Sequence, residues 1–599
     1  MSAERVPSRV ALSDPPLRRE NRVARGAPRS LIGVVALLGP AALMAMVLAW
    51  PMLLTSSGLG GDWEHHLWFI WRQSLAIRAD HAPSMFLNTG YSVLYPLYAF
   101  YGGTIYALAG VLAIALGNSP ISAYVLTYIL GFLAAYGGWY WIGRTVGLPR
   151  LLAQIPALVF VTSACYLTLI YGIGDWPEFL ALSMLPLMVG AALSVLRAER
   201  LRILPAAALA LSSIVFFGSH ILTVLWACTL LALAIAVVIA CVPSTRPWLQ
   251  RRRLIRVAAV VIPALLVNAW FLLPMVAYAS HTQIGSQYGV AYEDLQASMQ
   301  LVAFSDLFTL SRASAVPGVY GYALSLPTPA IVWVLASVMV LLWGARRGTW
   351  MRLLVVFTAI TTGIVLLMTH EGLLRTLPKP YTLLQFSYRL EGYVLMGVTA
   401  AVLAALMLVR SQMGRLRFWA WTIAPVLILS VVGAIQQVDA YPPTPLSRSA
   451  TLTSRGELFA RKFTDYAYTP LPAISESGLP TLDIAPAELH HNHGSFTLRA
   501  RPGQLVATNI GGGPDLLHIT GASVAGIDTR SQLVLAVGSS VAAGSADPHT
   551  SLATERISIS PAHSLPVVLG RLLALVGALA LVAGFVALSA RAYRERARR

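Results

Sequence analysis

The sequence is poor in charge, in lysine and in cysteine. Only 11% of its 599 residues are charged, against about 25% in an average soluble domain. It has two lysines, Lys379 and Lys462. Its three cysteines, Cys165, Cys228 and Cys241, lie within or at the edge of apolar runs and have no CxxC spacing. These absences exclude an ordinary soluble domain, a disulfide framework and a cysteine-based metal site.

Long apolar runs take up much of the chain, of which 57% is hydrophobic. Runs of about 17–25 apolar residues are long enough to cross a bilayer. Twelve spans are predicted, at 31–54, 120–142, 151–171, 178–196, 202–218, 220–241, 256–279, 329–344, 351–368, 391–409, 417–437 and 566–590. The predicted fold class is therefore a polytopic α-helical membrane protein of about 12 spans.

The distribution of arginine predicts the topology and argues against nucleic-acid binding. The net charge is +18, but the arginines gather in short connections between apolar runs, as in cytoplasmic loops. One more apolar stretch, 93–116, is ambiguous. If it does not cross and the N-terminus is cytoplasmic, 28 of the 43 basic residues lie inside. If it crosses, the later arginine-rich connections face outward, against the positive-inside rule. We therefore expect 93–116 to lie along the outer face, with both termini cytoplasmic.

Four parts are predicted along the chain. Residues 1–30 hold seven arginines and are expected to form a disordered cytoplasmic tail. Residues 31–437 form the transmembrane core, with juxtamembrane helices in the first outer loop, 55–119. Residues 438–565 alternate in a strand-like way between turn signals, which predicts a small extracytoplasmic β-sandwich-like domain. Residues 566–599 hold the last span and a basic cytoplasmic tail. No cleavable signal peptide is expected, because the first apolar run is long enough to span.

The first candidate site follows the first predicted span, in Gly61-Asp62-Trp63-Glu64-His65-His66. Paired carboxylates such as Asp62 and Glu64 serve as a general base or bind a divalent cation such as Mg, Mn or Ca. Acids in a solvated loop are the alternative. His65 and His66 would point about 100° apart on a helix, so anchoring at the membrane interface fits them better than chelation.

Two more outer segments carry titratable residues. In 174–178, Asp175 and Glu178 are candidate pocket acids, although both are equally well explained as residues that favour a helix N-terminus. His220 interrupts apolar sequence between two spans. A histidine at a membrane boundary either has a buried partner or lies in a solvated turn.

Basic residues in 370–390 lie on the predicted outer side, whereas most arginines lie in predicted cytoplasmic connections. These basic residues are Arg375, Lys379 and Arg389. Such residues call for an anionic partner, and a lipid-linked phosphate is the natural candidate. Anchoring to anionic headgroups is the alternative.

Together these features resemble the GT-C superfamily of membrane glycosyltransferases. Within it they are most similar to bacterial YfhO-like proteins, also labelled as related to a 6-pyruvoyl-tetrahydropterin-synthase-like membrane region. Five segments carry the resemblance, at 62–66, 88–97, 174–186, 268–274 and 385–390. In the last, Ser387 stands where the family pattern has proline.

The resemblance implies a function and a set of site residues. In GT-C enzymes the acid of the first outer loop is the catalytic base and the donor is usually a polyprenyl-phosphate sugar. Asp62 is then the base, and Glu64 is its partner or a metal ligand. Arg389, with Lys379 or Arg375, stabilises the leaving phosphate. Candidate pocket residues are His65, His66, Tyr95, Asp175, Glu178 and His220.

The expected protein is thus an inverting glycosyltransferase of the bacterial inner membrane, with an extracytoplasmic active site. Its acceptor is expected to be a cell-envelope glycan, glycolipid or protein. Two alternatives stay open. A transporter or flippase is expected to show internal repeats and charges near the bilayer midplane, which the sequence lacks. In the second alternative, the protein is a catalytically silent envelope-assembly scaffold whose function lies in the β domain.

Overall fold

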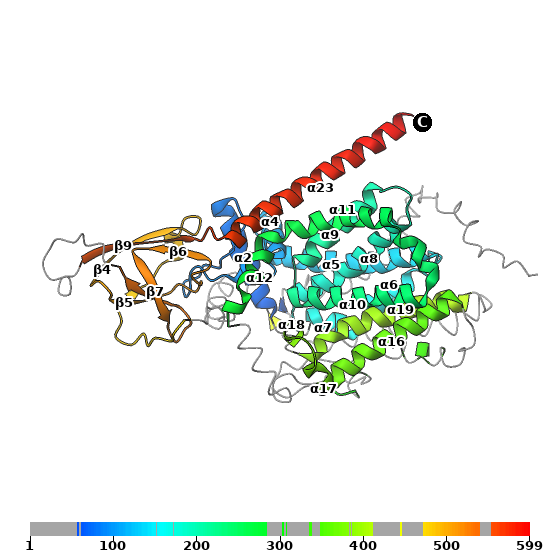
Figure 1. Cartoon of the computed structure of the whole chain (residues 1–599), viewed down its shortest axis with the longest axis horizontal. Helices are drawn as coiled ribbons and strands as arrows, with labels where there is room; N and C mark the ends of the chain where they lie inside the picture. The colour runs from blue at the N-terminus through cyan, green and yellow to red at the C-terminus, as the bar shows by residue number, and fades with distance from the viewer. Residues whose placement is uncertain are drawn as a thin grey trace, which may run out of the picture.

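The computed structural model is a helical body with a sheet region at one end (Figure 1). It describes residues 57–58, 62–150, 152–171, 173–283, 302–304, 307, 333, 335–337, 339, 348–382, 384, 386–410, 444–445, 471–538 and 553–598. The predicted spans 31–54 and 417–437, most of 329–344 and the N-terminal tail lie outside the described residues.

Six described helices are long and apolar enough to cross a membrane. They are α5 (Pro120–Val146), α8 (Trp176–Arg197), α10 (Ile221–Cys241), α16 (Thr349–Thr369), the helical segment Ser387–Leu408 that holds most of α19 (Glu391–Arg410), and α23 (Leu565–Ala597). Two bent pairs raise the number to at most eight. They are α6 (Gln154–Val161) with α7 (Ala164–Tyr171), bent by 47°, and α11 (Arg251–Val267) with α12 (Ala269–Tyr278), bent by 69°. Twelve spans are therefore not confirmed.

The shorter helices bear on two predicted segments. The span predicted at 202–218 is α9 (Ile203–Phe217), which has 15 residues. The stretch 93–116 holds α3 (Leu97–Phe100) and α4 (Gly103–Ala115), which has 13 residues. At 1.5 Å per residue, α4 is roughly 20 Å long, less than the ~30 Å of a hydrocarbon core. This length agrees with a stretch that does not cross, and the side on which it lies stays a prediction.

Close packing on α5 positions α8 at its middle and at its start. A Cβ added to Gly138 of α5 would lie 2.3 Å from the backbone nitrogen of Leu187, in the middle of α8. Only a glycine lets the two backbones approach so closely, as in other small-residue helix contacts. At the start of α8, the indole N–H of Trp176 donates to the hydroxyl of Thr127 of α5 at 2.8 Å, so the end next to Asp175 is also held against α5.

The C-terminal part of the chain forms two sheets. The first has the order β3 (Thr481–Leu482), β5 (Leu505–Thr508), β8 (Leu533–Val537), β7 (Ala522–Ile527). The second has the order β4 (Gly494–Ala500), β9 (Ala553–Pro561), β6 (Leu517–Thr520). Val506 and Leu535 of the first sheet and Ile557 of the second are fully buried in the core. The predicted β-rich region is thus confirmed.

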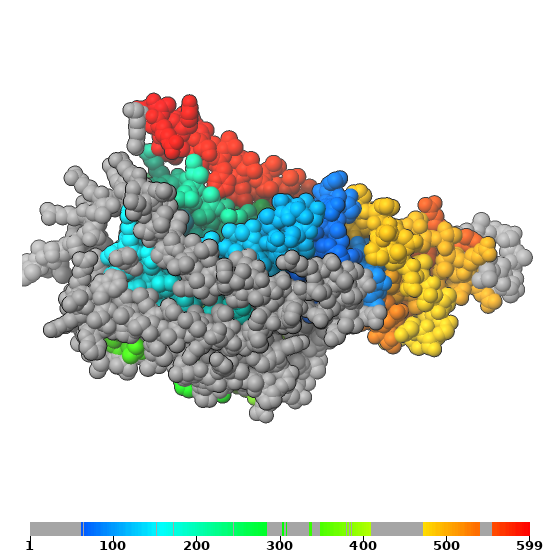
Figure 2. All heavy atoms as spheres, turned by 180° about the vertical axis from the view of Figure 1, so that it is seen from behind, coloured from blue at the N-terminus to red at the C-terminus, as the bar shows by residue number. Residues whose placement is uncertain are grey.

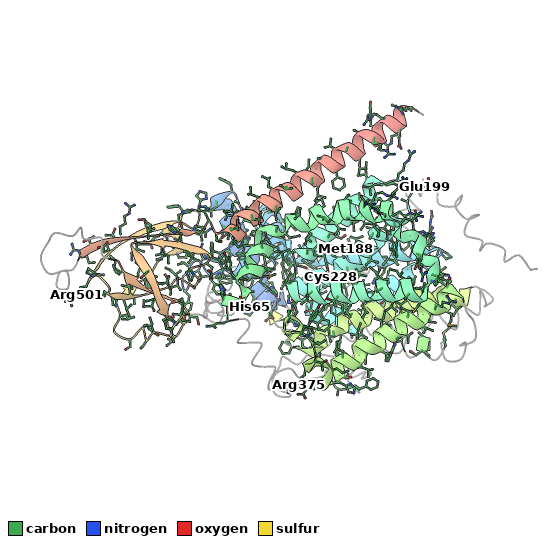
Figure 3. All side chains as sticks on the ribbon, viewed as in Figure 1. His65, Met188, Glu199, Cys228, Arg375 and Arg501 are labelled. Atoms are coloured by element: carbon green, nitrogen blue, oxygen red, sulfur yellow. The ribbon has the colours of Figure 1, made fainter. Side chains whose placement is uncertain are left out.

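The connection after α8 and the sheets lie at opposite ends of the molecule. Glu199, in the connection that also holds Arg200, lies at one end of the helical body, and Arg501 lies at the far end of the sheet region (Figure 3). His65 lies between them, where the helical body meets the sheets (Figure 3). Seen from behind, the sheets stand off the body next to the segment that begins with α2 (Trp63–Asp80) (Figure 2).

Candidate active site

The first of the predicted outer motifs, 62–66, begins α2, and Asp62 stands at the start of this helix. The carbonyl oxygen of Asp62 accepts the backbone N–H groups of His65 and His66, at 3.0 and 3.2 Å. Its side chain is therefore at the N-terminal end of the helix and makes no capping hydrogen bond there. This side chain is 47% exposed, and its Oδ1 lies 3.4 Å from Nδ1 of His65. Hydrogen bonds thus hold the backbone of Asp62 in place, while its carboxylate is accessible from outside the protein.

The second outer motif lies against the first. The backbone N–H of Asp62 donates to the carbonyl oxygen of Ile173 at 2.7 Å. Two residues further on, Oδ1 of Asp175 accepts the N–H of Glu178 at 3.1 Å, which caps α8. The helix-capping interpretation of Asp175 is therefore confirmed, and the same residue also belongs to a buried ionic cluster.

That cluster joins Asp175 and Glu178 to Arg389, which lies in the turn that leads into α19. Nη1 of Arg389 donates to Oδ2 of Asp175 at 2.9 Å and to Oε2 of Glu178 at 2.5 Å. Each carboxylate is only 4% exposed and the arginine 12%. The arginine predicted to meet a phosphate therefore already binds two buried acids.

His220 completes the cluster at the same nitrogen of Arg389 that binds the two acids. Its Nδ1 accepts the N–H of Thr223 at 3.4 Å and lies 2.7 Å from the Thr223 hydroxyl, so His220 caps α10. Its Nε2 lies 3.5 Å from Nη1 of Arg389. The side chain is buried. The alternative of a solvated turn is therefore wrong for His220.

Aromatic rings surround His66, whose side chain is 3% exposed. Nδ1 of His66 lies 2.6 Å from the hydroxyl of Tyr106. Tyr101 stacks on the imidazole at 6.2 Å between ring centroids, and Trp176 lies at 6.4 Å. Tyr101 also meets His220 edge to face at 5.9 Å. Interface anchoring is thus wrong for His66, because protein buries its ring.

Burial sets the protonation of these groups. It lowers the pKa of His66 to about 4, outweighing the attraction of Asp175 and Asp62. Burial likewise lowers the pKa of His220 to about 4. Burial opposes ionisation of Asp175, but the charge of Arg389 prevails and holds the pKa of that carboxyl below its ordinary range. Near neutral pH the site therefore has neutral imidazoles beside an ionised Asp175.

The remaining predicted site residues lie apart from this cluster or lack a described side chain. Tyr95 packs against Gly511 of the sheet region, since a Cβ on that glycine would lie 3.1 Å from the ring. Arg375 lies in α17 (Glu371–Arg375), is exposed and forms an ion pair with Glu371 at 2.5 Å. The side chains of Glu64 and Lys379 are not among those described.

The described side chains offer no metal centre. Among them, no group of three or more His, Cys, Asp or Glu residues is placed to hold an ion. Asp175 and Glu178 both bind Arg389.

Three residues of the site do not follow from the titratable motifs. Tyr101 and Tyr106 belong to the apolar stretch 93–116, whose hydrophobicity hid their role as ring partners of His66. Trp176 stands between two singled-out residues, Asp175 and Glu178, and its side chain turns toward His66. An aromatic residue between two acids is a signal that finds Trp176, whereas no such signal marks Tyr101 and Tyr106.

Comparison with known proteins gives structural matches only. No family model matches the sequence, and no curated protein does. The oligosaccharyltransferase of Archaeoglobus fulgidus in the apo form matches with 13% identity and a TM-score of 0.44, over 75% of this chain and 62% of that one. Its complex with an inhibitory peptide and a dolichol-phosphate matches with 14% identity and a TM-score of 0.41, over 76% and 63%.

A further match is the arabinofuranosyltransferase AftD from Mycobacteria, with 16% identity and a TM-score of 0.35, over 71% of this chain and 27% of that one. This chain thus spans less than two thirds of the structures it matches. These matches are to an oligosaccharyltransferase and an arabinofuranosyltransferase. The narrower likeness to YfhO-like proteins stays a prediction. At these TM-scores we base the functional proposal on the geometry of the site.

Proposed function

We propose that the protein is an integral-membrane, inverting glycosyltransferase that moves a sugar from a polyprenyl-phosphate donor to a cell-envelope acceptor on the outer face. One contrast supports it most. Asp175 and Glu178 are buried and bound to Arg389, whereas the carboxylate of Asp62 beside them is 47% exposed. A general base must come within about 2.6–3.2 Å of the proton it removes. Of these three acids, Asp62 is the one that an acceptor hydroxyl can reach.

The proposed reaction is a single displacement. Asp62 accepts the proton of the acceptor hydroxyl as its oxygen attacks the anomeric carbon. A bond forms between that oxygen and the carbon, the bond from the carbon to the phosphate oxygen breaks, and the phosphate leaves with the electron pair. Attack from the side opposite the leaving group inverts the configuration. The proposed partner of Asp62 is Glu64, which lies two residues further along the first turn of α2.

The sugar would bind at the aromatic rings around His66. Among the described residues, Nε2 of His66 is buried and has no hydrogen-bond partner. An unsatisfied buried polar atom costs about 1–3 kcal/mol. A sugar hydroxyl both donates and accepts, so it satisfies Nε2 whichever ring nitrogen carries the proton. The amphipathic rings of Tyr101 and Trp176 suit the apolar face of the same sugar.

Arg389 keeps its proposed role toward the donor phosphate, with an added condition. The two acids engage Nη1 of the guanidinium and so hold the arginine in place. A donor phosphate would be attracted by the positive charge of this held arginine. Arg375 and Lys379, in 370–390, would also help to bind the donor phosphate. In this proposal 370–390 and the sheet region both lie on the outer side.

The proposal is tested by transfer assays on membranes that contain the intact protein. Labelled polyprenyl-phosphate sugars are offered with envelope fractions as acceptors, and label is followed into the acceptor. Transfer that is lost on Asp62→Asn supports the proposal. A panel of donors that gives no transfer with the wild-type protein, while envelope assembly still depends on the chain, favours the silent scaffold.

A further inference from the structure

A hairpin turn of the sheet region, residues 490–493, reaches the first outer loop. His490 and His493 exchange backbone hydrogen bonds at 2.9 and 2.8 Å. Between them His491 and Asn492 have φ values of 53° and 62°. Two successive positive φ values are typical of the tight type I′ hairpin turn, and asparagine tolerates them well. The histidine-rich sequence, which looks like a metal motif, thus builds a turn that docks on α2 and the segment after it.

The side chain of Asn492 bridges two residues of that segment. Its Oδ1 accepts from Nδ2 of Asn88 at 2.8 Å, and its Nδ2 donates to the hydroxyl of Ser84 at 3.3 Å. Beside it, the backbone N–H of His491 donates to Oδ1 of Asp80 at 3.2 Å. These contacts join residues about four hundred positions apart in the sequence.

Asn88, which binds Asn492, is also hydrogen-bonded to Leu94. Oδ1 of Asn88 accepts the backbone N–H of Leu94 at 2.7 Å, and its carbonyl oxygen accepts from the Arg72 guanidinium. Leu94 is completely buried and has a φ of 54°, which a leucine rarely adopts. Such a left-handed conformation costs about 1–2 kcal/mol and persists only where neighbours impose it. Asn88 is one of those neighbours.

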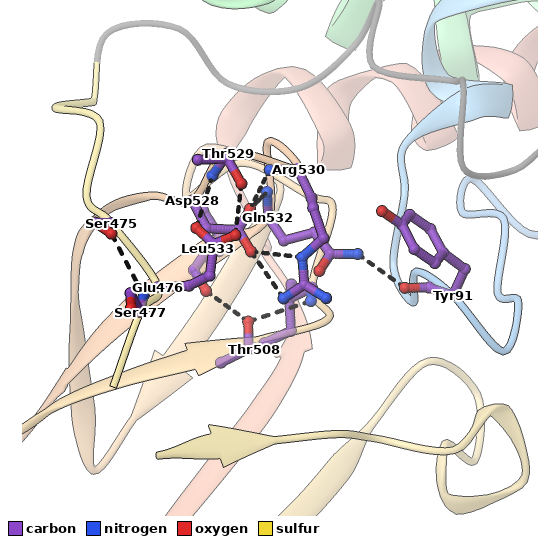
Figure 4. A network of polar contacts seen from close by, with 11 residues as sticks. Tyr91, Ser475, Glu476, Ser477, Thr508, Asp528, Thr529, Arg530, Gln532 and Leu533 are labelled. Atoms are coloured by element: carbon purple, nitrogen blue, oxygen red, sulfur yellow. Dashed lines mark hydrogen bonds and ion pairs between the residues drawn. The ribbon is translucent and has the colours of Figure 1, made fainter. Parts of the chain in front are cut away.

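The sheet region supplies a second set of contacts to the same stretch. The N–H of Val93 donates to the carbonyl of Asn509 at 2.8 Å, and the N–H of Gly511 donates to the carbonyl of Val93 at 2.9 Å. Nε2 of Gln532 donates to the carbonyl of Tyr91 at 2.8 Å. Figure 4 shows this last bond next to the Asp528–Arg530 ion pair, which braces the loop that carries Gln532.

The stretch that is held in this way leads directly into the site. Tyr101 follows Leu94 by seven residues and stacks on His66. We propose that Asn492 is a positioning residue for the transfer reaction, because it holds Asn88 and thereby sets the path of 88–101 and the placement of Tyr101. The sheet region is then a part of the catalytic unit. The activity readout rests on the proposed glycosyltransferase function, and the structural readout does not.

Three variants of the full-length chain separate the side-chain bridge from the turn. Asn492→Gly removes both side-chain hydrogen bonds and still tolerates a φ of 62°. Asn492→Asp keeps an oxygen that accepts from Asn88. His493→Ala is the matched control, because this imidazole is exposed in the same turn.

The first readout is hydrogen exchange of the amides of 87–95 in the purified protein, which needs no activity. Loss of both side-chain hydrogen bonds should make exchange in Asn492→Gly about tenfold faster or more. His493→Ala should match the wild type, and Asn492→Asp should fall closer to the wild type than Asn492→Gly does.

The second readout is sugar transfer at equal protein abundance. Asn492→Gly should lower kcat about tenfold with little change in KM for the donor, since displaced groups misorient the substrate. Asn492→Asp should recover most of this loss. If Asn492→Gly equals His493→Ala in exchange, or loosens 87–95 without lowering kcat, the positioning role is wrong. If the wild-type protein shows no transfer, the proposed function fails, and the exchange result still decides whether the bridge exists.

Discussion

The backbone N–H of Asp62 donates to the carbonyl oxygen of Ile173 at 2.7 Å, and this bond joins two segments that are far apart in the sequence. It places an exposed carboxylate beside a pair of buried ones. The exposed acid is suited to proton transfer, and the buried pair is suited to holding Arg389. Each of these two roles, and the contacts that support them, leads to a testable prediction.

Removing Arg389 should destabilise the protein as well as weaken the donor site. Arg389→Ala leaves two buried carboxylates, Asp175 and Glu178, without their shared cation. Breaking a buried ion pair costs roughly 3–5 kcal/mol. Glu178→Gln instead leaves one acid paired with one cation, so its loss should be smaller. Thermal unfolding in detergent measures both. An Arg389→Ala protein as stable as Glu178→Gln would contradict the structural role.

Stability should fall as the pH falls from about 6.5 to about 4. Burial lowers the pKa of both His66 and His220 to about 4 in the folded protein, while an unfolded histidine titrates near 6.5. Between these values the unfolded state binds more protons, so each imidazole removes up to ~1.4 kcal/mol of stability per pH unit as the pH falls. Below about 4 this effect levels off.

The slope of unfolding free energy against pH identifies the histidines that titrate. His66→Gln should reduce the pH dependence of unfolding between 4 and 6.5, whereas His493→Ala, at an exposed position, should leave it unchanged. Denaturant unfolding of the detergent-solubilised protein at a series of pH values measures the slope. An unchanged slope in His66→Gln means that this ring is not buried in its neutral form.

Two adjacent glycines of α5 should respond in opposite ways to alanine. A Cβ on Gly138 would overlap the backbone of α8 at Leu187, while a Cβ on Gly137 meets nothing within 4 Å. Gly138→Ala should therefore destabilise by about 1–3 kcal/mol, and Gly137→Ala should be neutral or stabilising. Thermal unfolding of both proteins gives the comparison. Equal effects would argue against the close α5–α8 contact.

Cysteine labelling tests whether the first loop and the sheets lie on the outer side of the membrane, as predicted. In a chain whose three native cysteines are replaced by alanine, single cysteines at Asn118 and Arg501 should react with a membrane-impermeant maleimide added to intact cells. Both positions belong to parts that the positive-inside rule assigns to the outer side. Labelling of Asn118→Cys from the cytoplasmic side alone would reverse the topology of 93–116.

Local signals in the sequence account for part of the fold and of the site. The Asp175-Trp-Pro-Glu178 pattern predicts a helix start, and α8 begins at Trp176. Alternation in 495–500 predicts β4, which forms from Gly494 to Ala500. These signals act within one turn or one strand, so a short window contains them.

The parts that the sequence did not reveal depend on long-range contacts. Arg389 meets Asp175 and Glu178 from a helix two hundred residues away, and no spacing rule links them. Whether His66 anchors at an interface or lies buried depends on what packs over it, which periodicity does not say. The turn at Asn492 matters because of Asn88, a partner that only the folded chain brings near.

The base assignment is the central claim, and the comparison of Asp62→Asn with Asp175→Asn tests it most directly. Transfer from labelled polyprenyl-phosphate sugar is measured in membranes with equal amounts of each protein, together with donor binding. Asp62→Asn keeps the shape of the side chain but removes the basic oxygen, so turnover should fall about 10²–10⁴-fold with donor binding little changed. Near-normal transfer by Asp62→Asn, with transfer abolished in Asp175→Asn or Glu178→Gln, would place the base in the second outer loop and contradict the account.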